Sequence, residues 1–267
     1  MRRSSLLEIH DRPWFPGFLR DHVTDALQLL LNLAGVYRPI VPRLRQALQQ
    51  AHARHIIDLC SGAGGPWPRL AESLRREGSL SFVVLLTDKY PHTEISPLAT
   101  ASAEKQRTYF HREPVDATHV PAELSGFRTI FNSFHHFPPP EARSILQDAA
   151  EKHQGIGIFE TPGRHAVTLL LVCLIPVGYF LLAPVQRPFR WSRLFWTYLL
   201  PVIPFVLFFD GIVSCLRVYS PRELQELVSA LPASENGYDW QIGVERGGLL
   251  RVPVTYLIGI PIPPNRS

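Results

Sequence analysis

The spacing of apolar side chains changes near residue 54 of this chain. Residues 6–53 carry apolar positions at helical spacing, and Pro39 and Pro42 mark a break between two predicted helices. From residue 55, short apolar stretches alternate with amphipathic ones. The predicted strands cover residues 55–60, 80–88, 108–116, 127–134, 155–160, 238–246 and 252–262, and the predicted helices cover 66–78, 97–106, 138–153 and 220–231. We therefore expect an α/β fold with a doubly wound, mostly parallel seven-stranded sheet that ends in an antiparallel hairpin.

Two long apolar segments interrupt the alternation between the fifth predicted strand and the last predicted helix. Residues 166–185 carry no charge, and residues 194–216 carry only Asp210. Each segment is about as long as a membrane-crossing helix requires. The linker between them contains arginines and Trp191, which favour a membrane interface. We predict that residues 166–216 form a hydrophobic helical hairpin that associates with a membrane.

Three forms of this hairpin stay open. A two-pass anchor would place Arg187, Arg190 and Arg193 on the outer side, against the positive-inside tendency. Prolines within both segments favour kinked helices. These features favour a hairpin that dips into one leaflet. In the absence of a membrane, the same helices would form a buried apolar lid or a dimer interface.

Composition and charge narrow the class of protein. The chain has 267 residues, of which 46% are hydrophobic and 19% charged, so a disordered chain is excluded. The net charge of +4 is scattered, without a basic helix interleaved with aromatics, and no nucleic-acid partner is expected. Cys60, Cys173 and Cys215 are widely spaced and predict neither disulfides nor a metal site. A reducing compartment fits best, with the catalytic domain on the cytoplasmic side of the membrane.

Polar groups follow several predicted strands. The first strand runs into “DLCSGAGG”, in which Gly62 and Gly64 permit positive φ and a close approach of ligand to backbone N–H groups. A third spaced glycine and a GK[ST] are both missing, which excludes a dinucleotide fingerprint and a P-loop. Asp88, Asp116 and the “NSFHHF” segment, residues 132–137, follow later strands. Each aspartate alone also suits an ordinary turn, but their order favours one ligand site at the carboxyl ends of the strands.

Together these stretches resemble the class I S-adenosylmethionine-dependent methyltransferase family. The resemblance covers roughly residues 55–160 and 218–261, and its motifs include “IIDLCSGAGG”, “VVLLTDKYP”, “EPVDA” and “IFNSFHHFPPPEARSILQDA”. It implies a Rossmann-like methyltransferase fold that binds S-adenosyl-L-methionine. Two departures affect the shape of the expected pocket. His55 stands where the family often has an acid, and “PWP” after the glycines makes a stiff helix start.

The resemblance also implies a role for each polar group. The residues implied for the methionine end of the cofactor are Asp58, Ser61, Gly62 and Gly64. The residues implied for the other parts of the cofactor are Asp88 at the ribose, Asp116 and Ala117 at the adenine, and Asn132 and Ser133 at the sulfonium region.

Methyl transfer from a sulfonium depends mostly on positioning, because the leaving group is already good. A hydroxyl or amine acceptor also needs a base. His135 and His136 lie at the expected mouth of the site and are the candidate catalytic residues. His10 and His22 are alternatives if the N-terminal segment forms a lid rather than a helix that only caps the sheet. Histidines after this strand also occur without a catalytic role.

These observations divide the chain into four expected parts. They are an N-terminal helical lid or cap (1–54), a cofactor-binding core (55–164), the hydrophobic hairpin (165–217), and a C-terminal helix with an antiparallel hairpin (218–267). The predicted function is a methyltransferase acting on a hydrophobic small-molecule or lipid-like acceptor at a membrane. Two alternatives stay open: a non-catalytic cofactor-binding scaffold at the membrane, and a cyclase or decarboxylase on the same fold.

Overall fold

The computed structural model describes residues 3–4, 6–62, 64–76, 81–91, 107–161, 163–232, 237–247 and 252–262, and the predicted helix over 97–106 lies outside them. The strands are β1 (His55–Leu59), β2 (Val83–Leu86), β3 (Thr108–Phe110), β4 (Phe127–Phe131), β5 (Ile156–Glu160), β6 (Tyr238–Gly247) and β7 (Val252–Pro261). They form a seven-stranded sheet in the order β3-β2-β1-β4-β5-β7-β6. β7 is antiparallel to β5 and β6, while the other pairs are parallel. The predicted sheet is therefore confirmed.

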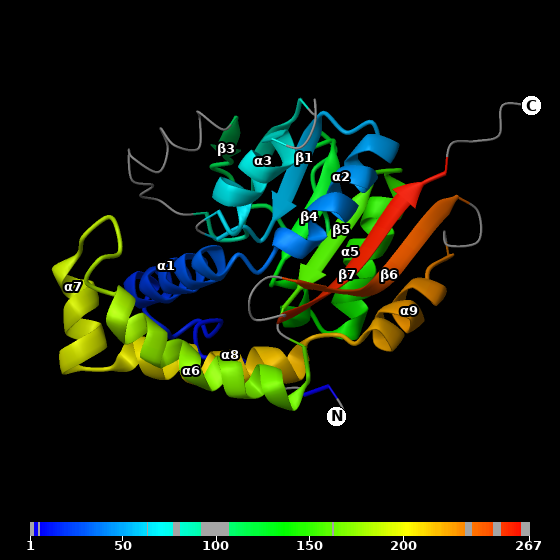
Figure 1. Ribbon diagram of the computed structural model, residues 1–267. Helices are drawn as coiled ribbons and strands as arrows, with labels where there is room; N and C mark the ends of the chain where they lie inside the picture. The colour runs from blue at the N-terminus through cyan, green and yellow to red at the C-terminus, as the bar shows by residue number, and fades with distance from the viewer. Residues whose placement is uncertain are drawn as a thin grey trace, which may run out of the picture.

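Helices cover both faces of the sheet (Figure 1). α2 (Val41–Gln50) and α3 (Trp67–Arg76) share one apolar cluster with the sheet. α5 (Pro139–Glu151) and α9 (Pro221–Ser229) share a second cluster on the opposite face. Because both faces are covered, the central strands are apolar along nearly their whole length, as their sequences predict.

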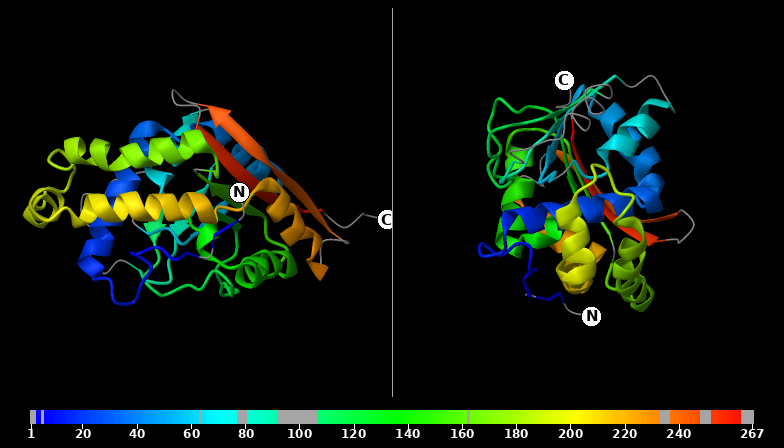
Figure 2. Two further views of the ribbon diagram at one scale, coloured as in Figure 1. Left: turned by 90° about the horizontal axis from the view of Figure 1, so that it is seen from below. Right: turned by 90° about the vertical axis from the view of Figure 1, so that its left-hand side faces the viewer.

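A third group of helices lies near the edge where the parallel strands end (Figure 1). α1 (Gly17–Ala34) packs against α6 (Ala166–Leu182) and α8 (Val202–Arg217) around an apolar cluster of their own. α7 (Trp191–Leu194) and the π-helical segment η3 (Phe195–Leu199) join α6 to α8. α6 and α8 run side by side (Figure 2).

The N-terminal region differs from the prediction in two ways. Residues 6–16 form turns rather than a helix, because their polar groups bond to α8 and to the loop after β4. The break between the first two helices falls at Gly35, whose φ of 59° gives a left-handed C-cap. Pro39 lies in the short 3-10 segment η1 (Arg38–Ile40), and Pro42 lies in the first turn of α2, where proline is tolerated.

Among the described residues, no single helix has both the length and the apolarity that a membrane crossing requires. One pair of helices, Trp191–Leu199 and Val202–Arg217, meets both criteria together, with a bend of 73° at the break between them. The apolar stretch Thr168–Leu182 of α6 is shorter than a span.

Ser220 and Glu223 cap the start of α9 reciprocally, and we expect this cap to stabilise the protein measurably. The Ser220 hydroxyl accepts from Glu223 N at 3.3 Å, and Glu223 Oε2 accepts from Ser220 N at 2.8 Å. Ser220→Ala should therefore lower the free energy of unfolding by about 1 kcal/mol in urea denaturation. Ser144→Ala is the control, since that hydroxyl only donates to Pro140 O within α5. Equal losses in both variants would contradict the capping role.

Candidate active site

The order of strands reverses at β1, whose neighbours are β2 and β4, and ligands bind at such switch points in doubly wound sheets. β1 and β4 are each followed by a residue with left-handed backbone, Cys60 (φ 56°) and Asn132 (φ 50°). This conformation is uncommon outside glycine. The Ser133 hydroxyl donates to Cys60 O at 3.4 Å. The glycine turn and the “NSFHHF” segment are therefore neighbours, as predicted for one site.

Two carboxylates hold the glycine turn. Asp88 Oδ2 accepts from Gly62 N at 2.9 Å, and Asp88 Oδ1 accepts from Tyr90 N at 2.9 Å. The Ser61 hydroxyl donates to Asp58 Oδ2 at 2.7 Å. Burial raises the pKa of Asp58 to about 6 despite its hydrogen bonds. Asp58 therefore supports the turn from the protein interior, whereas Asp88 is only partly buried and lies beside it.

α1 lies over the glycine turn. Gly62 and Gly64 have positive φ of 49° and 101°, and a Cβ at Gly62 would stand 3.1 Å from Thr24 Cγ2 of α1. Gln28 Nε2, also on α1, donates to Gly65 O at 3.2 Å. The turn thus requires glycine for its conformation, and the N-terminal region contacts the predicted cofactor loop directly.

The loops that carry Asp88 and Asp116 are adjacent. Val115 N donates to Asp88 O at 2.9 Å. Hydrogen bonds from the Thr118 hydroxyl and backbone hold the pKa of Asp116 at about 2, so this group is a carboxylate at neutral pH. Ala117 is buried beside it. A small hollow adjoins these loops, lined by Ser61, Gly62, Leu86, Asp88, Phe110 and His111.

Asn132 joins β4 to the loop after β5. Its Oδ1 accepts from Thr161 N at 2.7 Å, and its own N donates to Phe159 O at 3.0 Å. Ser133 donates to backbone oxygens at the ends of β1 and β4. Both residues therefore fix the geometry of the switch point, and their predicted contact with a sulfonium stays a prediction.

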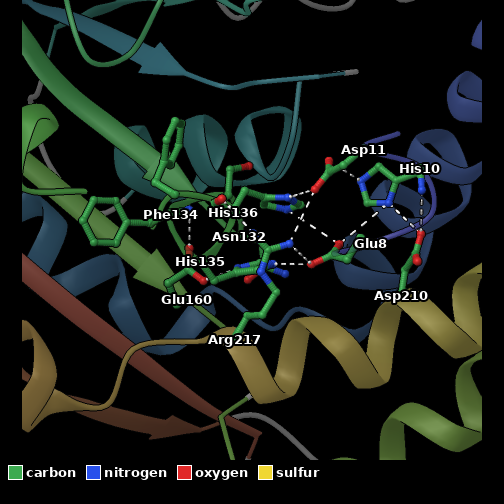
Figure 3. A network of polar contacts seen from close by, with 12 residues as sticks. Glu8, His10, Asp11, Asn132, Phe134, His135, His136, Glu160, Asp210 and Arg217 are labelled. Atoms are coloured by element: carbon green, nitrogen blue, oxygen red, sulfur yellow. Dashed lines mark hydrogen bonds and ion pairs between the residues drawn. The ribbon is translucent and has the colours of Figure 1, made fainter. Parts of the chain in front are cut away.

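His135 is buried between two carboxylates (Figure 3). Its Nδ1 lies 2.5 Å from Glu160 Oε2, and its Nε2 lies 3.3 Å from Glu8 Oε1. Burial lowers the pKa of His135, but the two carboxylates outweigh burial and raise that pKa to about 10. A general base needs an unprotonated nitrogen near neutral pH. This arrangement therefore suits a positioning residue better than the predicted base.

His136 has a different environment. Its Nδ1 lies 2.6 Å from Asp11 Oδ2, and its Nε2 lies 3.8 Å from Glu8 Oε2 (Figure 3). A carboxylate on Nδ1 favours the tautomer that leaves Nε2 free to accept a proton. Its side chain is 21% exposed, compared with 2% for His135. His136 is therefore the better candidate base of the predicted pair.

Residues 8–11, which we call the N-terminal strap, reach the same place. Asp210 of α8 accepts from Ile9 N at 2.6 Å and from His10 N at 3.1 Å, and its Oδ2 lies 2.8 Å from His10 Nδ1. Arg217, at the end of α8, lies 3.5 Å from Glu8 Oε1 and donates to His136 O at 2.7 Å. Burial raises the pKa of Glu8, but the surrounding histidines hold that pKa well below its ordinary value.

Sequence reasoning missed five charged residues of this network, namely Glu8, Asp11, Glu160, Asp210 and Arg217. Two of these residues have a feature in the sequence that could have identified them. Asp210 is the single charge in a long apolar segment, and such residues often have a functional role. Glu160 ends the fifth strand, at the same edge of the sheet as the other polar groups. The other three come from turns or helix ends far away in sequence, and their convergence exists only in the folded chain.

Among the comparisons with known proteins, only solved structures resemble this chain. No family model and no curated protein matches the sequence. The solved structure of the plantazolicin methyltransferase BpumL in complex with SAH is similar over 94% of each chain, with 10% sequence identity and a TM-score of 0.57. Human N-acetylserotonin methyltransferase in complex with SAM is similar over 94% of this chain and 61% of that chain, with 12% identity and a TM-score of 0.47. The first likeness shows that the chain has the Rossmann-like fold of class I methyltransferases.

The remaining candidate, His22, lies away from this network. Its burial predicts that the stability of the protein depends on pH. Its Nε2 lies 3.0 Å from the Ser192 hydroxyl, and burial lowers its pKa to about 4. The unfolded chain binds a proton at His22 near pH 6.5, whereas the folded chain does so only near pH 4. The stability associated with neutral His22 is present above pH 6.5 and is lost as the pH falls to 4.

The free energy of unfolding of the wild type should therefore exceed that of His22→Gln most above pH 6.5. This difference in the free energy of unfolding should become steadily smaller as the pH falls to about 4, because glutamine does not titrate. Urea unfolding of both proteins at matched pH values measures the difference directly and cancels the other titrating groups. A difference that stays constant across this range would show that folding does not lower the pKa of His22.

Proposed function

We propose that this protein is an S-adenosyl-L-methionine-dependent methyltransferase. The observation that carries the proposal is the convergence of the glycine turn, Asp88 and the “NSFHHF” segment at the switch point of a methyltransferase-type sheet. BpumL, which shares this fold, was solved in complex with SAH. Doubly wound sheets bind their ligands at this edge, which supports placing the cofactor among these polar groups.

The residues at the switch point suit this cofactor. Gly62 has positive φ and lines the small hollow beside Asp88, where its backbone can approach a ligand. Ser61 and Gly62 would hold the methionine end, and the free lone pairs of Asp88 would accept the ribose hydroxyls. The charged Asp116 lies on the adjacent loop, which supports its predicted place near the adenine. When bound, the cofactor supplies an electrophilic methyl group on its sulfonium.

We propose a hydroxyl or amine of a hydrophobic molecule as the methyl acceptor. The apolar cluster of α1, α6 and α8 adjoins the catalytic candidates, because α8 contacts the 3-10 turn η2 (Phe134–His136). An apolar acceptor would pack against these helices while His136 Nε2 accepts its proton. His135 and Glu160 hold the turn in place, since Glu160 Oε1 accepts from Phe134 N at 2.8 Å.

The cofactor assignment predicts the effect of removing Asp88. Hydrogen bonds to a charged group contribute about 1.5–3 kcal/mol each, so Asp88→Ala should weaken cofactor binding roughly tenfold to a hundredfold. Calorimetric titration with S-adenosylmethionine and S-adenosylhomocysteine measures this loss. Asp239→Ala, at an exposed position on β6, is the matched control and should bind as the wild type does.

Cofactor titration of the wild type, together with a methyl-transfer assay, distinguishes the alternative functions. Wild type that binds neither ligand would overturn the cofactor assignment. Transfer of labelled methyl groups into the organic extract of the source cells, followed by identification of the product, would support the methyltransferase. Binding without transfer would instead favour the cofactor-binding scaffold, or the cyclase or decarboxylase.

We further propose that α6 to α8 associate with a membrane. Large apolar side chains on this segment are exposed, and they include Leu170 (64%), Leu181 (77%), Trp191 (77%) and Leu199 (70%). Extended apolar surfaces of this kind mark interaction sites. Arg187 and Arg190 flank Trp191 in the linker, and arginine with tryptophan favours anionic headgroups. A membrane would also supply a hydrophobic acceptor next to the catalytic candidates.

The triple variant Leu181→Ser, Trp191→Ser and Leu199→Ser tests this association. Each of these side chains contributes about 1.5–3 kcal/mol when fully buried, so binding to anionic lipid vesicles should fall at least roughly tenfold in a flotation assay. The control is Tyr109→Ser, Val244→Ser and Ile262→Ser, which removes exposed apolar groups elsewhere. Equal binding of the two variants, or no binding by the wild type, would refute the membrane proposal.

A further inference from the structure

We propose that Glu8, His10 and His136 bind a divalent transition-metal ion such as Zn²⁺, which fastens the N-terminal strap to the loop after β4. One ligand atom from each of these residues lies within 4.8 Å of the other two. Figure 3 shows the three side chains converging from the strap and from the “NSFHHF” segment. The proposal does not depend on the cofactor assignment, because it uses none of the cofactor-binding residues. It replaces the role of His136 as a base, because an ion on Nε2 occupies the only lone pair of that nitrogen. With the ion bound, a hydroxide in its fourth position would take the acceptor's proton instead.

The spacing of two of the ligand atoms, on Glu8 and His136, is wider than a direct contact and close to the spacing around an ion. Glu8 Oε2 and His136 Nε2 are 3.8 Å apart, which is too far for a hydrogen bond. A tetrahedral ion with bonds of about 2.0 Å holds its ligand atoms ~3.3 Å apart. A contraction of a few tenths of an ångström would therefore bring both atoms to bonding distance of a central ion.

Both imidazoles carry the carboxylate partner that metal-binding histidines usually have. His136 Nδ1 lies 2.6 Å from Asp11 Oδ2, and His10 Nδ1 lies 2.8 Å from Asp210 Oδ2. Such partners fix the tautomer and orientation of the ring and make the other nitrogen a stronger ligand. In both residues this leaves Nε2 as the nitrogen for the ion. His136 Nε2 faces Glu8, whereas in His10 it is Nδ1 that lies 3.7 Å from Glu8 Oε2, and Nε2 lies 3.6 Å from Asp11 Oδ1.

The excess of carboxylates around the strap also favours the binding of a cation. Glu8 is 1% exposed, and the carboxylates of Glu8, Asp11 and Asp210 surround the two imidazoles. Arg217 pairs with Glu8 at 3.5 Å and with Asp11 at 3.6 Å. With His10 and His136 neutral, the carboxylates of these three acidic residues and of Glu160 face, among the described residues, only Arg217 and the protonated His135, and buried charges are stable only when they are paired. One divalent ion supplies the missing positive charge.

The kind of ligand indicates the class of metal. Imidazole nitrogens suit zinc, copper, iron and nickel, whereas magnesium and calcium prefer oxygen ligands only. Two histidines and one carboxylate also leave a fourth position for water or a substrate atom. We therefore expect Zn²⁺ to bind in preference to Mg²⁺.

The test is metal binding by the full chain without a histidine tag, stripped with a chelator and then titrated with Zn²⁺. We expect one equivalent to bind and to raise the thermal midpoint, while Mg²⁺ at the same concentration does neither. Glu8→Gln, His10→Gln and His136→Gln should each weaken Zn²⁺ binding at least roughly tenfold, and Asp11→Asn should do so roughly tenfold to a hundredfold. His22→Gln, another buried N-terminal histidine, is the control and should bind as the wild type does.

A spectroscopic measurement on the wild type covers the case in which these variants do not fold. Cu²⁺ loaded at one equivalent should show coupling to two imidazole nitrogens by electron paramagnetic resonance, and Zn²⁺ should displace it. The proposal is wrong if the wild type binds no Zn²⁺, if folded ligand variants bind it as tightly as His22→Gln does, or if the copper signal lacks two nitrogen ligands.

Discussion

The enclosed carboxylate of Glu8 is the contact on which the organisation of this site depends. It lies within 3.3 to 3.8 Å of charged or titratable groups of His135, His136 and Arg217. These partners come from the loop after β4 and from the end of α8, so one side chain joins the N-terminal strap to two distant parts of the chain. A buried carboxylate without such partners would be strongly unfavourable, which is why the strap, the loop and α8 hold one another in place.

A second constraint comes from the sheet itself. β1 and β4 are adjacent and parallel, so their following loops emerge at one edge. The left-handed backbone of Cys60 and Asn132 turns the chain sharply there, and such conformations concentrate at functional sites because the surroundings must stabilise them. The glycine turn and the histidines are thus presented together by the strand order, and α1 contacts the turn from the outside.

The regular parts of the fold could be predicted because their signals are local. Strand positions, the capped start of α9 and the terminal hairpin follow from apolar periodicity and turn residues within a few positions of each other. Residues 6–16 could not, since their conformation depends on Asp210, some two hundred positions later. The preference for His136 over His135 as a base also required the buried neighbours Glu160 and Glu8, which no spacing reveals.

By itself, the sequence determined the strand and helix types, the mostly parallel sheet, and the loops that carry Asp88, Asp116 and His136, because each depends on the pattern of nearby residues. Only the tertiary structure decided which charges meet. Glu8 and Asp11 lie about two hundred positions before Asp210 and Arg217, and the packing of α1, α6 and α8 brings them together. Long-range ion pairs depend on distance in space, and distance along the chain holds almost no information about them.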